Sequence, residues 1–188
     1  MQAQEIEHYL AELGAALQEQ GINKPVRMLL IGGAYMMLLA NAPRTTDDID
    51  ICWLEEGEDF RTARLALRDG VQAIASKYAL PPNWFNYLTQ MLIYDKIMMP
   101  RGKLWKRFGT LHVYAPSKEY ILALKILAGR DQDLADCRIL LPQTRIRTRQ
   151  QAQRVLDRYI LPDAQREEAE TIASSLDVLF GSEKEREP

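Results

Sequence analysis

The segment LLIGGAYMMLLANAPRTTDDIDICW, residues 29–53, constrains the fold of this 188-residue chain more than any other. An apolar run ending at Ile31 has the composition of a short buried strand, and Gly32 and Gly33 come directly after it. A helix-like stretch follows, and residues 48–54 then alternate polar and apolar side chains, as a half-buried strand does. We therefore predict a strand, a glycine turn, a short helix and a second strand in this segment.

Hydrophobic periodicity predicts the other elements. Helices are expected at residues 4–19, 59–78, 118–128, 131–141, 149–160 and 163–180, and strands at residues 91–99 and 110–116. The basic segment PRGKLWKRFG, residues 100–109, is expected to separate the last two strands. In PPNWFN, residues 81–86, we expect a helix start with Trp84 in the core and Asn86 open to a functional role. Five methionines are expected to fill the core: Met36, Met37, Met91, Met98 and Met99.

These elements predict an α+β fold with a small mixed β-sheet flanked by helices, followed by a C-terminal helical part. The helix-rich character begins at Ser117, a good N-cap. We expect a core at residues 1–115 that includes the N-terminal helix, and a helical part at residues 116–181 packed on that core. Residues 182–188 are charged and carry no apolar side chain, so a disordered tail is expected there.

Composition narrows the possible partners. A net charge of -2 and a pI of about 5.8 give the whole molecule no attraction to nucleic acid or anionic membranes, so such a partner needs a local patch. No apolar stretch approaches the ~20 residues of a membrane span, and the N-terminal residues lack the basic start of a signal peptide. We expect a cytoplasmic protein without a membrane partner. Cys52 and Cys137 have no paired spacing, so neither a disulfide framework nor a zinc site is expected.

The opening segment carries two features with chemical meaning. Gly32 and Gly33 follow a strand and open a helix, which lets the backbone and its free N–H groups approach a phosphate, although tight packing is the alternative. Asp48 and Asp50 occupy positions i and i+2 of a strand, so their side chains project from the same face. Two neighbouring carboxylates repel each other and suit a hard cation between them, whereas a solvated aspartate-rich turn is the alternative.

Lys125 is the only charged residue in YILALKILAG, residues 120–129. A buried ammonium group requires an anionic partner, either a phosphate or an acidic side chain such as Asp136. The alternative is a side chain that extends along the apolar surface and places its charge in solvent.

Together these motifs resemble the signature of the nucleotidyltransferase fold, the polymerase-beta-like superfamily. Within it, the chain is most similar to the AbiEii-like and MenT-like nucleotidyltransferase toxins of type IV toxin–antitoxin systems and their uncharacterised bacterial relatives. The first matching motif is a glycine pair, an Arg followed by Thr, and Asp-apolar-Asp, here Gly32, Gly33, Arg44, Thr46, Asp48 and Asp50. The second is carried by LKILAGRDQDLAD and consists of Lys125, Ala128, Arg130, Asp133 and Asp136. The resemblance covers roughly residues 29–140.

The resemblance implies transfer of a nucleotidyl group from a nucleoside triphosphate (NTP) to an acceptor, with Mg²⁺ or Mn²⁺ held by Asp48 and Asp50. It places Gly32, Gly33 and Thr46 at the nucleotide and Lys125 at the phosphates, with Arg44 and Arg130 at the phosphates or paired with the aspartates. Asp136, with Asp133, would orient Lys125 or brace its helix. Many members have a third carboxylate on a later strand, for which Asp95 is the one strand-like candidate here.

The same resemblance implies an RNA acceptor, in the toxin-like relatives the 3′ end of tRNA, and a cognate antitoxin as a partner. Lys96, Arg101, Lys103, Lys106 and Arg107 surround Trp105, and five arginines lie between residues 145 and 158, so RNA contacts and a merely solvated basic face are both open. Two other functions stay open as well. One is transfer of AMP to a protein hydroxyl, and the other is a non-catalytic nucleotide- or nucleic-acid-binding module of the same fold.

Overall fold

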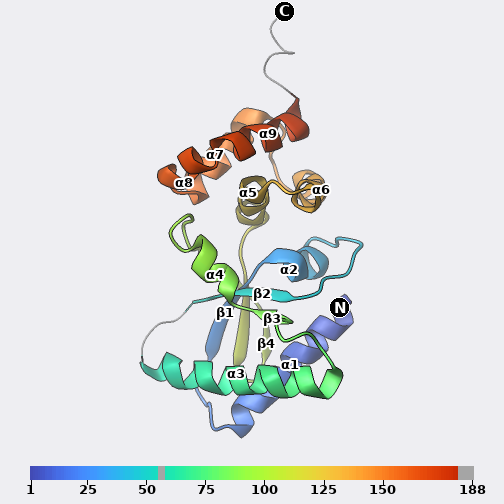
Figure 1. Ribbon diagram of the computed structural model, residues 1–188, viewed down its shortest axis with the longest axis vertical. Helices are drawn as coiled ribbons and strands as arrows, with labels where there is room; N and C mark the ends of the chain where they lie inside the picture. The colour runs from blue at the N-terminus through green and yellow to red at the C-terminus, as the bar shows by residue number, and fades with distance from the viewer. Residues whose placement is uncertain (55–57, 182–188) are drawn as a thin grey trace, which may run out of the picture. The chain divides into compact units, whose positions relative to one another are not determined.

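The computed structural model describes residues 1–54 and 58–181, and Figure 1 follows the order of its helices and strands. Among these residues the fold is mixed, with a five-stranded sheet and nine α-helices, which agrees with the expected α+β class. The tail for which disorder is expected, residues 182–188, lies outside the described residues. Within the described ranges, no helix combines the length and apolar character that crossing a membrane requires.

The bounds of the elements are as follows. The helices are α1 (Ala3–Glu19), α2 (Gly32–Leu39), α3 (Glu58–Tyr78), α4 (Leu88–Ile93), α5 (Lys118–Ala128), α6 (Asp131–Leu140), α7 (Arg149–Tyr159), α8 (Pro162–Glu167) and α9 (Ala169–Phe180). The strands are β1 (Val26–Leu30), β2 (Ile49–Trp53), β3 (Phe85–Asn86), β4 (Lys103–Phe108) and β5 (Leu111–Ala115).

The chain divides into two compact units. The first consists of residues 1–91 and 101–116, and the second of residues 92–100 and the chain from residue 117 onward. The first unit contains the whole sheet with α1, α2 and α3, and the second contains α5 to α9.

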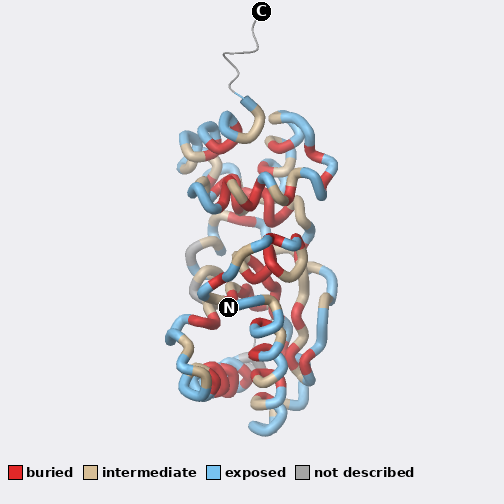
Figure 2. Tube along the Cα trace, turned by 90° about the vertical axis from the view of Figure 1, so that its right-hand side faces the viewer, coloured by how far each residue is buried: buried red, intermediate tan, exposed pale blue. Residues whose placement is uncertain are grey.

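The sheet of the first unit has the order β3-β2-β1-β5-β4. β1 pairs with β2 in antiparallel and with β5 in parallel orientation, while β2 pairs with β3 in parallel and β4 with β5 in antiparallel orientation. Met28, Leu29 and Leu30 of the central strand are all 0% exposed, so β1 is buried on both faces. Figure 2 shows how buried and exposed residues are distributed along the whole chain. The apolar run in the sequence is explained by this central position.

The two faces of β2 divide as the alternation predicts. Ile49 and Ile51 are fully buried, whereas Asp50 between them is half-buried on the opposite face. Leu29 pairs with Cys52, and side chains directly opposite one another share a face, so Asp50 lies on the same sheet face as Leu29 and Cys52. The predicted alternation is therefore confirmed for Ile49, Asp50 and Ile51, whereas Asp48, which was expected on the same strand, precedes β2.

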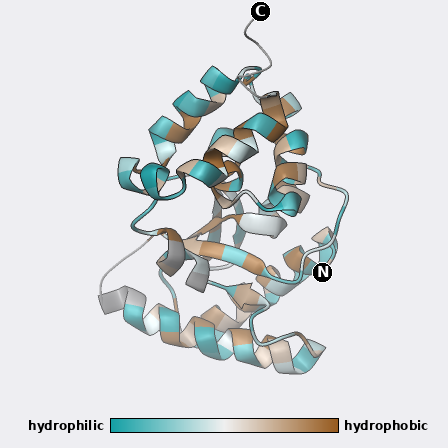
Figure 3. Cartoon of the chain, turned by 45° about the horizontal axis from the view of Figure 1, so that its top comes forward, coloured by the Kyte–Doolittle hydropathy of each residue, from teal (hydrophilic) through white to brown (hydrophobic). Residues whose placement is uncertain are grey.

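Two long amphipathic helices, α1 and α3, pack against each other in the first unit. α1 buries the predicted stripe, Ile6, Leu10, Leu13 and Leu17. Hydrophilic and hydrophobic residues alternate along α3 in Figure 3, as expected for a helix with one buried side. Gly14 lets α1 approach β4 closely, because a Cβ there would lie 1.9 Å from the backbone oxygen of Phe108.

The second unit is built around α5, which is almost wholly apolar. Ser117 caps this helix, accepting a hydrogen bond from the backbone N–H of Tyr120, as predicted. α5 ends at Gly129, which has a left-handed backbone (φ +62°) and lies close to Thr171 of α9. Helices α6, α7 and α9 pack around it, and Ile121, Leu122 and Ile126 are buried.

Several local predictions are wrong. Residues 91–99 do not form a strand: α4 ends within them at Ile93, whose carbonyl accepts hydrogen bonds from the N–H groups of Lys96 and Ile97 in a turn. The basic segment is strand β4, whose edge position leaves its cationic side chains in solvent. Residues 85–86 form β3 where a helix start is expected, although Trp84 is in the core, and the helix expected at residues 163–180 is divided into α8 and α9 at Glu168. Met91 and Met98 are exposed by 72% and 55%.

We predict that Gly14→Ala lowers the free energy of unfolding by about 1–3 kcal/mol, because the methyl group meets backbone that cannot move aside. Alanine is the better helix former by about 1 kcal/mol, so propensity alone gives the opposite sign. Gly70→Ala in α3 is the matched control, since its methyl group meets the end of the flexible Leu13 side chain at 3.0 Å. Urea denaturation measures both, and equal stabilities of the two variants would contradict the close packing of α1 on β4.

Candidate functional site

The turn from β1 into α2 brings the glycine pair into contact with β2. Gly32 has a left-handed backbone (φ +64°), and a Cβ at this position would lie 2.1 Å from Asp50 Oδ2. The N–H of Ile31 donates to the carbonyl of Asp50 at 3.0 Å, which fixes the turn beside this carboxylate. Glycine is therefore required here both for its backbone conformation and for the space that the Asp50 side chain occupies.

Gly33 makes a second close contact, with the loop that precedes β2. A Cβ at Gly33 would lie 2.4 Å from Thr46 Oγ1 and 3.5 Å from Arg44 Nη2. Thr46 is 8% exposed, its N–H donates to the Met1 carbonyl at 3.2 Å, and its hydroxyl donates to the Asp48 carbonyl at 3.1 Å. The loop is thus held against the first turn of α2, and all six residues of the first motif lie together in the first unit.

Asp50 accepts hydrogen bonds from two donors, one on β3 and one in the first turn of α4. Asn86 Nδ2 and Thr89 Oγ1 each donate to Asp50 Oδ1 at 2.8 Å, and Asn86 Nδ2 also lies 3.1 Å from Thr89 Oγ1. From the sequence, Asn86 was expected in a helix start and left open to a functional role, whereas Thr89 was not expected in the site. The parallel pairing of Asp50 with Asn86 was hidden because β3 is only two residues long.

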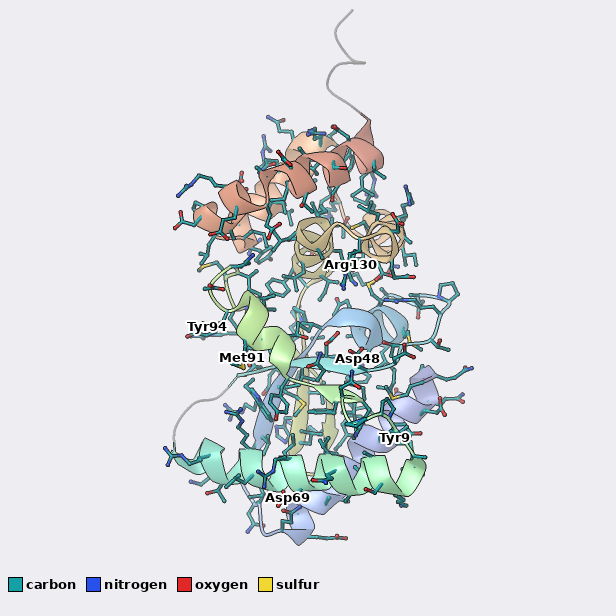
Figure 4. All side chains as sticks on the ribbon, in the orientation of Figure 1. Tyr9, Asp48, Asp69, Met91, Tyr94 and Arg130 are labelled. Carbon is teal, nitrogen blue, oxygen red and sulfur yellow. The ribbon has the colours of Figure 1, made fainter. Side chains whose placement is uncertain are left out.

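Asp48 precedes β2 (Figure 4), and its surroundings disfavour the negative charge of its carboxylate. Burial raises the pKa of its carboxyl group, and the nearby Asp50 and Asp47 carboxylates raise it further. Hydrogen bonds from Thr46 and Asn86 lower this pKa in part and do not cancel the rise. Ionisation of Asp48 is therefore opposed by burial and by the two neighbouring carboxylates.

The side chains beside this turn include oxygen ligands of the chemical type that Mg²⁺ or Mn²⁺ would require. Mg²⁺ is a hard cation that proteins commonly bind through one or two carboxylates together with substrate phosphates. Asp48 and Asp50 supply carboxylate oxygens close to the turn of Gly32 and Gly33, where the Asp50 and Thr46 side chains occupy the space that Cβ atoms would take. Within the described residues no three His, Cys, Asp or Glu side chains converge, so a site of this kind depends on ligands from a bound nucleotide.

Asp95 does not provide a third carboxylate on a strand. It is exposed in the turn after α4 and belongs to the second unit. The strand-like reading of this residue is therefore wrong. The strand position beside Asp50 is occupied by Asn86 instead.

The residues of the second motif lie together in the second unit. Lys125 Nζ of α5 lies 2.6 Å from Asp133 Oδ1 and 2.9 Å from Asp136 Oδ2, both on α6. Lys125 is 8% exposed, and the two aspartates are 1% and 0% exposed. Lys125 therefore does not extend into solvent, and its anionic partners are the acidic side chains that the sequence offered as one alternative.

Arg130 adds a second cation to this cluster. Its Nε donates to Asp133 Oδ2 at 2.6 Å, while 78% of the Arg130 side chain is exposed (Figure 4). Burial tends to raise the pKa of Asp133, but the hydrogen bonds from Arg130 and Lys125 outweigh it and lower that pKa. The cluster ties the end of α5 to the start of α6, and the predicted role of Lys125 at a triphosphate stays a prediction.

Neither cysteine suits nucleophilic chemistry. Cys52 on β2 and Cys137 on α6 are both 0% exposed, and burial raises the pKa of each thiol to about 12. The thiolate, which is the nucleophilic form, is therefore scarce at neutral pH.

We predict that Lys125→Met lowers the free energy of unfolding by about 3–5 kcal/mol, because it leaves two buried carboxylates without their shared cation. Lys103→Met removes the same charge from an exposed position and should change stability by less than about 0.5 kcal/mol. Thermal and urea denaturation compare the two variants. A loss below about 1 kcal/mol for Lys125→Met would mean that the pair contributes no more than a surface ion pair.

We predict that Asp48→Asn stabilises the protein at pH 7 without divalent cations, because the raised pKa of Asp48 means that its charge opposes folding. The folded-state pKa lies above the unfolded value of about 3.9, so protonation removes this penalty as the pH falls. The melting temperature of the variant should exceed that of the wild type at pH 7 and converge with it below about pH 4. Asp47→Asn is the control, because it removes an exposed charge next to Asp48 and should change the melting temperature less. If Asp48→Asn were less stable than the wild type at pH 7, the charge of Asp48 would not oppose folding.

No protein-family model matches this chain, and no curated protein or solved structure is significantly similar to it. The functional reading therefore depends on the residues of the two motifs and on their geometry.

Proposed function

We propose that the chain is a nucleotidyltransferase of the nucleotidyltransferase fold, and that its first unit binds an NTP together with Mg²⁺. The observation that carries the proposal is the contact between the Gly32–Gly33 turn and the side chains of Asp50 and Thr46. Here both glycines face polar groups of the loop and strand that carry the two aspartates.

The first turn of α2 is the proposed site for the nucleotide phosphates. The N-cap residue, Ile31, offers no side chain to the N–H groups of this turn, so the turn presents backbone donors and the positive end of the helix dipole. The Arg44 guanidinium lies beside Gly33, where it adds positive charge on the same side. These groups favour an anion at the first turn of α2.

Asp48 and Asp50 are the proposed ligands of the metal ion. When bound there, Mg²⁺ would stabilise the negative charge on the α-phosphate oxygens during transfer. In the proposed reaction an acceptor hydroxyl oxygen forms a bond to the α-phosphorus, and the bond from this phosphorus to the oxygen that bridges to the β-phosphate breaks. Pyrophosphate leaves, and the hydroxyl proton passes to solvent. Asn86 and Thr89 keep the Asp50 carboxylate oriented throughout.

The proposed acceptor is RNA. Arg27, His112 and Arg107 are paired across β1, β5 and β4, so their side chains lie in one row on the same sheet face as Asp50. Arg107 and Arg27 both lower the pKa of His112, after burial as the largest cause, which is expected if the three groups are close. This row supports a polyanionic acceptor such as the 3′ end of tRNA, and the toxin role implied by the resemblance would follow from modifying it.

The test is calorimetric titration of ATP, GTP, CTP and UTP into the wild type with and without Mg²⁺, and into the variant Asp48→Ala/Asp50→Ala. We predict Mg²⁺-dependent binding of at least one nucleotide that this variant loses while circular dichroism shows an intact fold. The matched control is Asp69→Ala/Asp95→Ala, which removes two exposed aspartates and should bind as the wild type does.

Turnover is measured next, by incubating the wild type with NTP labelled at the α-phosphate and with total tRNA. Labelled RNA that depends on Asp48 and Asp50 supports the enzyme. Binding without transfer to RNA or protein would instead indicate a non-catalytic nucleotide-binding module. Absence of nucleotide binding by the folded wild type would reject the proposal.

A further inference from the structure

The residue paired with Asp50 on the neighbouring strand is Asn86, whose side chain is a neutral amide. β3 runs parallel to β2, and Asn86 is the register partner of Asp50. Partners in neighbouring strands lie about 4.8 Å apart and point to the same face, so position 86 is the place on the sheet from which a third carboxylate would reach the same cation. The chain has an asparagine there.

Asn86 makes contacts that a carboxylate could not make. Its Nδ2 donates to Asp50 Oδ1 at 2.8 Å and lies 3.1 Å from Thr89 Oγ1, whose hydroxyl donates to the same Asp50 oxygen at 2.8 Å. A hydrogen bond from Asn86 also acts on Asp48. An ionised Asp at this position would have no proton to donate and would add a third negative charge.

We propose that Asn86 is a positioning residue that keeps the Asp48–Asp50 pair ordered without a cation, so that Mg²⁺ enters together with the triphosphate and not before it. The inference rests on the proposed function, because it assigns the cation to these two carboxylates. Two carboxylates held by neutral donors form a weak site for a bare cation, and the phosphates complete the ligand set. Asn86 thereby couples metal binding to nucleotide binding.

A purely structural role for Asn86 makes a different prediction. Asn86 belongs to a strand of two residues, and its side chain bonds could simply anchor α4 to the sheet. In that case a charged substitution would destabilise the protein equally with and without a divalent cation. In the proposed role the same substitution lowers stability without the cation and raises affinity for it.

The decisive variant is Asn86→Asp, studied in the full chain by titrating Mn²⁺ alone and following binding by electron paramagnetic resonance. The affinity of an oxygen-ligand site for a hard cation rises with the number of charged ligands, and we expect Asn86→Asp to tighten Mn²⁺ binding by at least about tenfold. Its melting temperature should fall in EDTA and recover when Mn²⁺ is added. The matched control is Asn83→Asp, which adds the same charge at an exposed position three residues away and should leave both measurements unchanged.

A second variant keeps the proposal testable if Asn86→Asp does not fold. Thr89→Val removes one donor to Asp50 without adding charge, and it should weaken binding of Mn²⁺ with NTP while a folded protein remains. Asn86→Asp that binds Mn²⁺ no more tightly than Asn83→Asp, or Thr89→Val with unchanged binding, overturns the inference.

The experiment separates the inference from the proposed function. Tight Mn²⁺ binding by Asn86→Asp, with no NTP bound by the wild type, would show that position 86 controls the affinity of the carboxylate pair for a cation, and it would reject both nucleotidyl transfer and the coupling to a triphosphate. Mn²⁺-dependent NTP binding by the wild type, with no effect of the substitutions, would uphold the function and reject the role of Asn86.

Discussion

The approach of the Gly32–Gly33 backbone to the side chains of Asp50 and Thr46 is the contact on which the rest of the first unit depends. β1 is buried on both faces and leads directly into α2, so the chain must turn at one residue, Ile31, where the central strand ends. A Cβ at either glycine would push the turn away from β2 and its preceding loop. Close packing therefore explains both glycines, because the space that Cβ atoms would take is filled by the Asp50 and Thr46 side chains. In the proposed function the backbone N–H groups of the same turn would bind phosphate.

The same contact concentrates opposing charges. The positive end of α2 faces carboxylates, which is favourable, while the carboxylates repel each other, which burial makes worse. Neutral donors act on these carboxylates in the free protein: the Thr46 hydroxyl on Asp48, and Asn86 with Thr89 on Asp50. A triphosphate alone would add negative charge to this balance, and a cation alone would lack ligands. Their joint binding satisfies both groups, which is the physical reason to expect one combined site.

Features set by short-range patterning were predictable from sequence, while those set by pairing across the sheet were not. The alternation in β2 and the cap at Ser117 each depend on neighbouring residues, and both are confirmed. By contrast, the basic segment becomes β4 because Phe108 pairs with Leu111 around a two-residue turn at Gly109. That glycine was a usable signal, outweighed by the charges beside it. Thr89 carried no signal at all, since its contact with Asp50 spans 39 residues.

Lys125 shows what a motif match can and cannot imply. The sequence left three partners for its ammonium group, namely solvent, a phosphate or an acidic side chain, and the structure pairs it with Asp133 and Asp136. Removing a buried cation from such partners costs several kcal/mol, so a phosphate could recruit Lys125 only by compensating both aspartates. Arg130 is better placed to respond to an anion, because its guanidinium already bonds Asp133 while most of its side chain remains in solvent. Lys125 accordingly links α5 to α6 through its buried ion pairs. An anionic ligand arriving from solvent would contact the exposed Arg130 side chain more readily than the buried Lys125.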